Sequence, residues 1–550
     1  MTRAGASLGA VGIWGCRWSA TATAVVISAL FAASGTASAR DGTLDRSFGS
    51  NGRVPYSFAP GSGGEGPGKV IVLKNGRIFS GGTGAGNGWG LALHDRRGDP
   101  VGLGGVGLAY HQISPGPGPF SFPADFARQS DGRWVGAGYV SETGGQPAAA
   151  VARFTGTGAL DSSFGNDPPN SLADGIVRID FPGATADFAS AVTVDRAGRL
   201  LVTGKTGAPF TSGPNDIFLA RLRKDGSPDP SFGEGGFAIA GPGTNDQGED
   251  VAVLPSGNIL VAGVTDGDLV LLRYRPSGRL DKSFGGGDGI AEAPGFGIES
   301  ESNAGMVLLR GGKILVGIND GKASGMSFKA VVGVARFTAK GRLDHSFSGD
   351  GKQRISVGDY EYFGGIAVAD DGRIVLSAVV RTGTRSDVLV ARLLPAGARD
   401  PSFGTAGIVV NHVEGLSQGA FALAIQPDRR IVVGADTYDG SSADAALIRL
   451  LGDTRRPGTK ITAGPSGRVS SGRVSFRFRV LDDVHARFQC ALSGAQPRSG
   501  TAAARPRFSN CRSPRSFPAA PGPRTFLVRA IDPAGNIDRT PASRSFTAVR

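Results

Sequence analysis

The chain has 550 residues, of which 19% are charged and 40% hydrophobic, and its formal net charge is +12 at pH 7. The 89 Gly and 33 Pro together make up less than a quarter of the chain, and no strict Gly-X-Y period occurs. Disorder along the whole chain and a collagen-like fold are therefore excluded. The length exceeds that of one ordinary domain, so we expect several domains or one large repeat array.

The first 39 residues have the pattern of a secretory signal peptide. Arg3 and Arg17 are basic, residues 21–33 form an apolar run, and the tripeptide Ala-Ser-Ala at 37–39 supplies small side chains before a cleavage point. The apolar run is too short to cross a bilayer, which needs about 20 residues. We therefore expect a secreted, extracellular protein without a transmembrane anchor, with association to the cell envelope as an alternative.

Residues 40–453 contain a repeat with two markers. One is an Asp-x-Ser-Phe turn that recurs about every 59 residues, and the other is a segment such as SDGRWVGAG or DDGRIVLSA. Each repeat also has four apolar runs of strand length separated by Gly- and Asp-rich breaks, as successive hairpins would. In the third repeat these runs are 175–181, 189–194, 199–203 and 217–222. Four strands, repeated seven times, predict an all-β, seven-bladed β-propeller of four-stranded units.

A fixed spacing, Arg-x4-Gly-x2-Asp-x-Ser-Phe, links the markers in five repeats. A turn aspartate of this kind accepts backbone N–H groups and pairs with a strand arginine, so we prefer a structural role to a ring of binding groups. The last repeat has the arginine without the turn, and the first has the turn without the arginine, so a closed ring adds one pair. The expected pairs are Arg153 with Asp161, Arg221 with Asp229, Arg273 with Asp281, Arg336 with Asp344, Arg392 with Asp400, and Arg449 with Asp45.

The first repeat departs from this pattern, since His94 stands where the arginine is expected and the turn is eroded around Asp99. A second column of residues lies 11 positions before the glycine of each DGR-type turn. Five of its seven members are carboxylates, and a ring of carboxylates would attract cations or a basic partner. The alternative is that they cap the strand entries through local hydrogen bonds. The column consists of Glu65, Ser121, Asp187, Asp246, Glu301, Glu361 and Gln418.

Residues 454–550 have a different composition, with 17 Arg and one Lys against four Asp, so this segment has a net charge of +14. Apolar and polar residues alternate over 474–480, and similar runs follow, which predicts an Ig-like β-sandwich. Cys490 and Cys511 remain after removal of a signal peptide. Two cysteines of an exported chain, close together in one small region, predict a disulfide.

Both parts of the chain resemble known families. The repeats are similar to the delta-60 repeat proteins of bacteria, whose units read approximately R-L-x-x-D-G-x-L-D-x-S-F-G followed by a DGK or DGR strand; the resemblance covers 41–453. It implies a propeller-like fold and no general biochemical activity. The segments FQCALSG and FLVRAIDPAGNIDRT resemble bacterial Ig-like domains of exported proteins, which implies an extracellular spacer or adhesion module.

The enzyme motifs in the sequence lack their structural context. The Gly-x-Ser-x-Gly match at 415–419 precedes an expected strand instead of a helix, the GLGGVG match at 102–107 has no helix after it, and the five His show no metal-ligand spacing. We therefore expect a monomeric, non-enzymatic binding or adhesion scaffold without cofactor or metal. Its propeller loops would bind an extracellular glycan, cell-wall polymer or protein, and its basic module would dock to an anionic envelope and not to nucleic acid.

Two alternatives remain open at this point. One is a glycan hydrolase or lyase that uses carboxylates such as Glu361 and Asp246 as acid and base. The other is a purely structural surface protein. A single carboxylate pair in a deep pocket would favour the enzyme, and the absence of any pocket would favour the structural protein.

Overall fold

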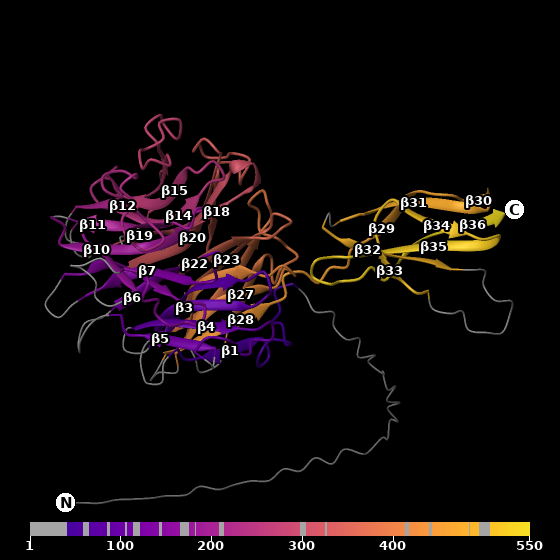
Figure 1. The fold of residues 1–550 in the computed structure, drawn as a ribbon, viewed down its shortest axis with the longest axis horizontal. Helices are drawn as coiled ribbons and strands as arrows, with labels where there is room; N and C mark the ends of the chain where they lie inside the picture. The colour runs from indigo at the N-terminus through magenta and orange to yellow at the C-terminus, as the bar shows by residue number, and fades with distance from the viewer. Residues whose placement is uncertain are drawn as a thin grey trace, which may run out of the picture. The chain divides into compact units, whose positions relative to one another are not determined.

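The computed structural model describes residues 41–58, 65–84, 88–104, 107–113, 121–141, 146–165, 175–181, 183–207, 214–297, 304–324, 327–412, 417–438, 443–482, 485–493 and 506–550. The predicted signal peptide and Glu301 fall outside these ranges. Within them the chain is all-β, with one 3-10 turn at Arg310–Gly312 (Figure 1). The described residues include no helix long and apolar enough to cross a membrane.

Seven antiparallel four-stranded sheets form between Arg53 and Leu450 in the described part of the chain. The sheets are β2(Gly66–Val72), β3(Ile78–Gly84), β4(Gly88–His94) and β5(Leu108–His111); β6(Ser121–Arg128), β7(Trp134–Val140), β8(Ala148–Phe154) and β9(Ile176–Ile179); β10(Ala186–Val194), β11(Leu200–Gly207), β12(Asn215–Leu222) and β13(Phe237–Ala240); β14(Asp246–Val253), β15(Ile259–Thr265), β16(Asp268–Tyr274) and β17(Ile290–Ala293); β18(Ala304–Leu308), β19(Ile314–Ser324), β20(Ser327–Phe337) and β21(Lys352–Ile355); β22(Tyr360–Val368), β23(Ile374–Thr382), β24(Arg385–Leu393) and β25(Ile408–Asn411); and β26(Ser417–Ile425), β27(Ile431–Tyr438), β28(Ala443–Leu450) and β1(Arg53–Tyr56). These four-stranded antiparallel units confirm the predicted all-β repeat class.

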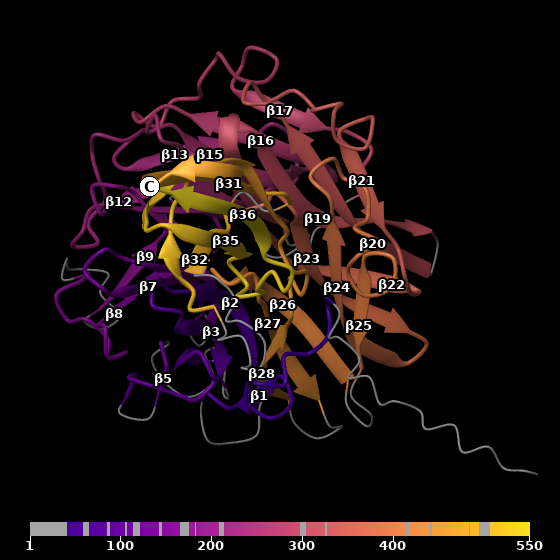
Figure 2. The ribbon, with the colours of Figure 1, turned by 90° about the vertical axis from the view of Figure 1, so that its right-hand side faces the viewer.

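The sheets follow one another around a ring. The first strand of each sheet contacts the first strand of the next, and β26 contacts β2, so these seven strands form a continuous circle. Figure 2 shows the indigo start of the chain beside the orange strands β26–β28. The ring is joined by β1, which pairs antiparallel with β28 from the far end of the repeats, placing Arg53 opposite Ile448.

One predicted strand belongs to a different sheet from the one the repeat boundaries indicate. The run at 175–181 contains β9, which pairs with β8 of the preceding repeat, with Ala149 opposite Ile179. Each Asp-x-Ser-Phe turn is thus followed by the outermost strand of the sheet that precedes it. This offset explains why the first repeat begins with a turn and the last one lacks it, since β1 completes the final sheet.

Neighbouring sheets pack by placing large side chains of one sheet against glycines of the other. Phe363 of β22 lies over Gly317 of β19, where an added Cβ would come within 2.5 Å of the phenylalanine ring. The aromatic rings of Phe79 and Trp134 stack at 3.7 Å between the first two sheets. These contacts bury the middle strands of each sheet on both faces, so their sequences read as continuous apolar runs.

Residues 459–549 form a three-stranded and a five-stranded sheet that share one apolar core. Phe476 of the smaller sheet stacks on Phe526 of the larger one, with ring centroids 4.0 Å apart. The predicted disulfide between Cys490 and Cys511 is present, and it joins neighbouring strands of the same sheet. The sheets are β29(Thr459–Ala463), β31(Gly472–Val480) and β34(Arg515–Ala519); and β30(Gly467–Ser470), β36(Ala542–Val549), β35(Gly522–Ile531), β32(Arg487–Ser493) and β33(Ser509–Cys511).

Candidate binding site on the ring axis

The six predicted arginine–aspartate pairs are all in contact. In each, the arginine Nε lies 2.7–2.9 Å from the aspartate Oδ2, and the guanidinium stacks on the phenylalanine of the same turn at 4.2–4.8 Å. The arginine Nη2 also donates to the turn serine, for example to Ser231 at 2.9 Å from Arg221. The Arg, Asp, Ser and Phe of the fixed spacing therefore contact one another, and we call this group the arginine clamp.

Each arginine clamp also joins its sheet to the next one around the ring. The Nη1 of Arg221 donates to the carbonyl of Pro276, and that of Arg449 donates to the carbonyl of Arg96, each in the following sheet. The clamp aspartate receives a second donor from the other sequence marker, as when Arg373 lies 3.0 Å from Asp400. The two markers of the sequence thus meet at a single structural junction.

The first repeat has no arginine clamp, and its alignment differs from the predicted one by one residue. Phe79 pairs with Leu93, as Val135 pairs with Arg153, so Leu93 and not His94 occupies the arginine position. Val101 N donates to the carbonyl of Leu93, which places Val101 at the aspartate position. His94 is fully buried, and burial lowers its pKa to about 4, so it stays neutral. The assignment of His94 to the arginine column is therefore corrected.

The column of predicted ligand-face carboxylates is turned toward the backbone. Phe58 N donates to Glu65 Oε2 at 2.8 Å, Gly243 N to Asp246 Oδ2 at 3.0 Å, and Val357 N to Glu361 Oε1 at 2.6 Å. Asp187 accepts from Phe181 N in the same way, and the amide of Gln418 accepts from Asn411. The described carboxylates of this column and Ser121 are all at most 4% exposed. This geometry favours the capping alternative, because each side chain satisfies N–H groups at the entry to an inner strand.

A β-bulge recurs on the first, inner strand of most sheets, four residues after the carboxylate column. The register shifts at the same place in β2, β6, β10, β14, β22 and β26, just before the residue that lies seven positions ahead of the turn glycine. A bulge redirects the side chains beside it. We call this set the axial position, and it consists of Lys69, Asp125, Ala191, Asp250, Gly305, Gly365 and Ala422.

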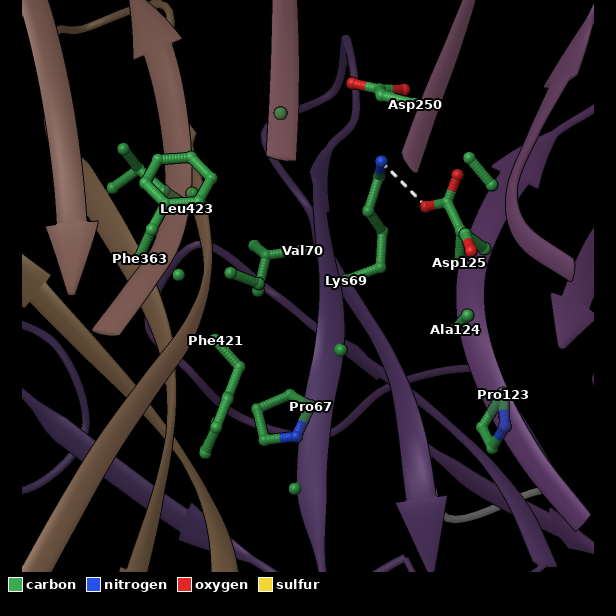
Figure 3. Close-up of a pocket in the computed structure, with 18 of the residues that line it drawn as sticks. Pro67, Lys69, Val70, Pro123, Ala124, Asp125, Asp250, Phe363, Phe421 and Leu423 are labelled. Atoms are coloured by element: carbon green, nitrogen blue, oxygen red, sulfur yellow. Dashed lines mark ion pairs between the residues drawn. The ribbon is translucent and has the colours of Figure 1, made fainter. Parts of the chain in front are cut away.

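All seven axial positions line a cavity of about 570 Å³. The first strands of all seven sheets contribute to its wall, which answers a question that the sequence left open, namely which strand faces the axis. One side of the cavity is charged and the other is apolar (Figure 3). The sequence analysis did not identify this site. A signal was present in the sequence, since three of the seven repeats carry a charged residue at a position where the other four have Ala or Gly.

The charged side consists of one lysine and carboxylates from two other sheets. Lys69 Nζ lies 2.7 Å from Asp125 Oδ1, and Asp250 stands on the other side of the lysine head (Figure 3). Asp125 accepts from Val192 N and Asp250 from Met306 N, each on the next inner strand. These hydrogen bonds to neighbouring backbone hold both carboxylates in fixed positions.

The ionisation of this group reflects its burial. Burial alone would lower the pKa of Lys69, but the negative charges of Asp125 and Asp250 outweigh it and raise that pKa. Burial raises the pKa of Asp250 to about 6, although Lys69 partly offsets the effect. The neighbouring Glu249 also has a pKa well above its usual value because it is buried. The described residues contain no cluster suited to hold a metal ion.

The repeats match one protein-family model, and no curated protein matches the chain. That model, "Domain of unknown function (DUF5122) beta-propeller", matches residues 129–164, 198–232, 254–284, 369–403 and 426–453. Similar solved structures include the extracellular domain of the BT4673 system from B. thetaiotaomicron, with 11% identity, 88% of this chain and 68% of that chain covered, and a TM-score of 0.26.

Two further similar structures belong to proteins with other names and functions. Prolyl oligopeptidase B from Galerina marginata matches at 8% identity over 74% of this chain and 54% of its own, with a TM-score of 0.33. MPT-4, a mannose phosphorylase from Leishmania mexicana, matches at 11% identity over 47% and 81%, with a TM-score of 0.23. The family-model matches, together with the repeated four-stranded sheets arranged in a ring, make this chain a β-propeller repeat protein.

Proposed function

We propose that this protein is a secreted, non-enzymatic binding scaffold, in which a closed seven-bladed propeller binds a ligand in its axial cavity. The observation that carries the proposal is the axial position itself. The fold repeats the same bulge in blade after blade, yet the side chains presented there differ from blade to blade and enclose about 570 Å³. Concave sites of this size with a few convergent polar groups are typical of small-ligand binding.

The glycan hydrolase alternative has less support from the geometry. Its acid and base, Glu361 and Asp246, lie in different blades, and each accepts a backbone N–H that its own strand entry requires. A glycosidase needs two carboxylates that flank one bond of the substrate. The axial cavity does contain two carboxylates that other blades lack, Asp125 and Asp250, but Asp125 is paired with Lys69 at 2.7 Å instead of facing a substrate bond. The purely structural alternative does not account for a cavity that is charged on one side.

We further propose that residues 454–550 are an Ig-like module that docks to an anionic polymer of the cell envelope. The outward face of β31 carries Arg473, Arg477 and Arg479, and Lys460 of β29 lies directly opposite Arg479. All four side chains are exposed, and like charges directly opposite each other destabilise a sheet. A partner with closely spaced negative charges would relieve this repulsion. We call these four residues the basic face.

The test uses the full chain and purified bacterial cell envelope, with retention measured at low and at high salt. We expect the variant K460Q/R473Q/R477Q/R479Q to lose the retention that salt releases, because screening acts on exposed charges. We expect Gly68→Phe, which fills the cavity, to lose whatever retention survives high salt. An added Cβ at Gly68 has no neighbour closer than 3.4 Å, so the backbone accepts the change.

The matched control is Gly286→Phe, at an exposed turn glycine whose added Cβ meets nothing closer than 4.0 Å. This variant should behave as the wild type at both salt concentrations. Equal retention of the wild type, the basic-face variant and Gly68→Phe would contradict the binding proposal for both parts of the molecule.

A further inference from the structure

The axial cavity divides into two chemically distinct halves. Lys69, Asp125 and Asp250 come from the first, second and fourth blades, whereas the remaining axial positions are Ala or Gly. Away from these charges, the labelled side chains of the last two blades are apolar (Figure 3), namely Phe363, Phe421 and Leu423. A ligand that fits both walls must have a polar end and an apolar body.

The polar half has a surplus of acceptors over cations. Lys69 is paired with Asp125 at 2.7 Å. Among the described residues, no cation lies within ion-pair distance of Asp250, whose oxygens accept only the backbone N–H groups of Val251 and Met306. Each carboxylate oxygen can accept a second hydrogen bond. Asp250 is therefore a fixed anionic acceptor with spare capacity toward the cavity.

A second and independent observation also points to a donor. Glu249, the bulged residue beside Asp250, lines the cavity and is 9% exposed. Its side chain is hydrogen-bonded to Gln247 and interacts electrostatically with Lys205, but its Oε1 has no hydrogen-bond partner. An acceptor that is buried without a partner has lost the hydrogen bonds that water would give it, so such groups ordinarily find a donor. A ligand that brings several N–H donors would satisfy Glu249 and Asp250 together.

Resting on the proposed binding function, we propose that the axial cavity selects small primary amines, with the ligand ammonium at Asp250 and Glu249 and an aromatic or aliphatic body against the half-buried Phe421 and Leu423. An ammonium has three donors and no acceptor, which matches the surplus acceptors. The aromatic wall buries the body and excludes water, which strengthens the ion pair at the other end.

The experiment compares three probes that share one body and differ in charge, with the full chain titrated in a calorimeter at pH 7.5. The probes are phenethylamine, 3-phenylpropionate and 2-phenylethanol. We expect phenethylamine to bind at least about tenfold more tightly than the other two, in keeping with the discrimination that a buried polar site achieves. Tighter binding of the anion or of the alcohol would overturn the charge assignment while leaving the cavity as a binding site.

One variant and a matched control test whether phenethylamine binding depends on the charge of Asp250. Asp250→Asn keeps the shape of the side chain but removes its charge, and we expect it to weaken phenethylamine binding about tenfold or more. Asp350→Asn makes the same chemical change at an exposed turn carboxylate that accepts Lys352 N at 2.9 Å, and it should leave binding unchanged. Equal affinities of the wild type and Asp250→Asn would overturn the proposal.

A pH titration of the wild type tests the same inference without a variant. The groups that face Asp250 are Lys69, Asp125 and Glu249, of which the lysine stays charged throughout. Phenethylammonium affinity should fall as the pH is lowered from 7.5 to 5, because Asp250 takes up a proton with a pKa of about 6. A flat profile would contradict the inference. If none of the three probes binds and Gly68→Phe leaves envelope retention unchanged, the proposed function fails as well.

Discussion

The arginine clamps and the axial position are built from the same repeats, but they use repetition in opposite ways. Six clamps have the same arginine, aspartate, serine and phenylalanine in nearly the same geometry. The seven axial positions carry one Lys, two Asp, two Ala and two Gly, and share no chemistry. Joining each blade to the next needs the same solution every time, whereas a ligand at the centre contacts every blade differently. The clamp residues, which are the same in six blades, hold the fold together, whereas the axial residues, which differ between blades, are those that a ligand at the centre would contact.

The largest effect that this comparison predicts is acid unfolding of the propeller. Burial would raise the pKa of the clamp aspartates, but the turn serine, the clamp arginine and, at Asp344, Lys313 outweigh burial and hold those pKa values below the usual range. A carboxyl with a depressed pKa stabilises the fold above its unfolded pKa near 4 and loses that contribution as the pH falls. We expect the melting temperature to drop steeply between about pH 4 and pH 2, as followed by scanning calorimetry. A gradual decline over the range from pH 7 to pH 4 would contradict this account.

Removing one clamp should cost less than losing all six. Arg392→Ala leaves Asp41 buried without its cation and leaves Asp400 with Arg373 alone, since Arg392 is 2.7 Å from Asp41 and 2.9 Å from Asp400. Breaking a buried ion pair in this way typically costs about 3–5 kcal/mol of unfolding free energy. Urea unfolding measures the change, with the exposed Arg399→Ala as the matched control expected to stay within about 0.5 kcal/mol. A loss of unfolding free energy below about 1 kcal/mol for Arg392→Ala would contradict the role of the clamp as a stabilising junction between blades.

At the axial position, removing a charge should stabilise the protein. Burial raises the pKa of Asp250 to about 6, so the fold favours its neutral form, and this stabilisation is present below pH 4 and lost as the pH rises through 6. Asp250→Asn should therefore raise the unfolding free energy by about 1–2 kcal/mol at pH 7.5 and change it little at pH 4. Urea unfolding at both pH values checks this. Destabilisation at both would place Asp250 with the clamp residues as an architectural group.

The smallest effect is expected from adding a carboxyl group to the axial position. Ala422→Asp would place it beside the next inner strand, as with Asp125 and Val192 and with Asp250 and Met306. Because the bulge accepts such a side chain in two other blades, the unfolding free energy at pH 4, where burial keeps the carboxyl group neutral, should change by no more than about 1 kcal/mol. The same measurement on Gly317→Asp provides the contrast, since Phe363 occupies the space that its Cβ needs, and a loss several times larger is expected. Similar losses of unfolding free energy for both variants would contradict the expectation that the axial positions accept different side chains.

Prediction from the sequence succeeded for features with a fixed residue spacing and failed where a β-bulge interrupts the two-residue period of a strand. Five clamp pairs follow from a constant interval between residues that touch, and the pair of Arg449 with Asp45 follows from closure of the ring. The axial cavity does not, because the bulge in each inner strand inserts one residue and shifts the alternation of side chains by one. The sequence left open whether Glu65 and Glu361 face a ligand or cap strand entries, because the choice depends on backbone N–H donors that only the structure locates. The arginine position of the first repeat was assigned to His94 instead of Leu93, because this repeat lacks the Asp-x-Ser-Phe turn from which the position is counted.

The pairing of β1 with β28 has a consequence for the order in which the molecule is assembled. Asp45 and Arg449 are 404 residues apart, so the first described segment to be synthesised has no partner until almost the whole repeat array has followed it. Joining the ends of a free chain of that length costs on the order of 5 kcal/mol in loop-closure entropy. Folded blades in between bring the ends together and remove most of that cost. Ring closure should therefore be a late kinetic step, and until it occurs the nascent chain exposes the open edge of β28 to pairing with other strands.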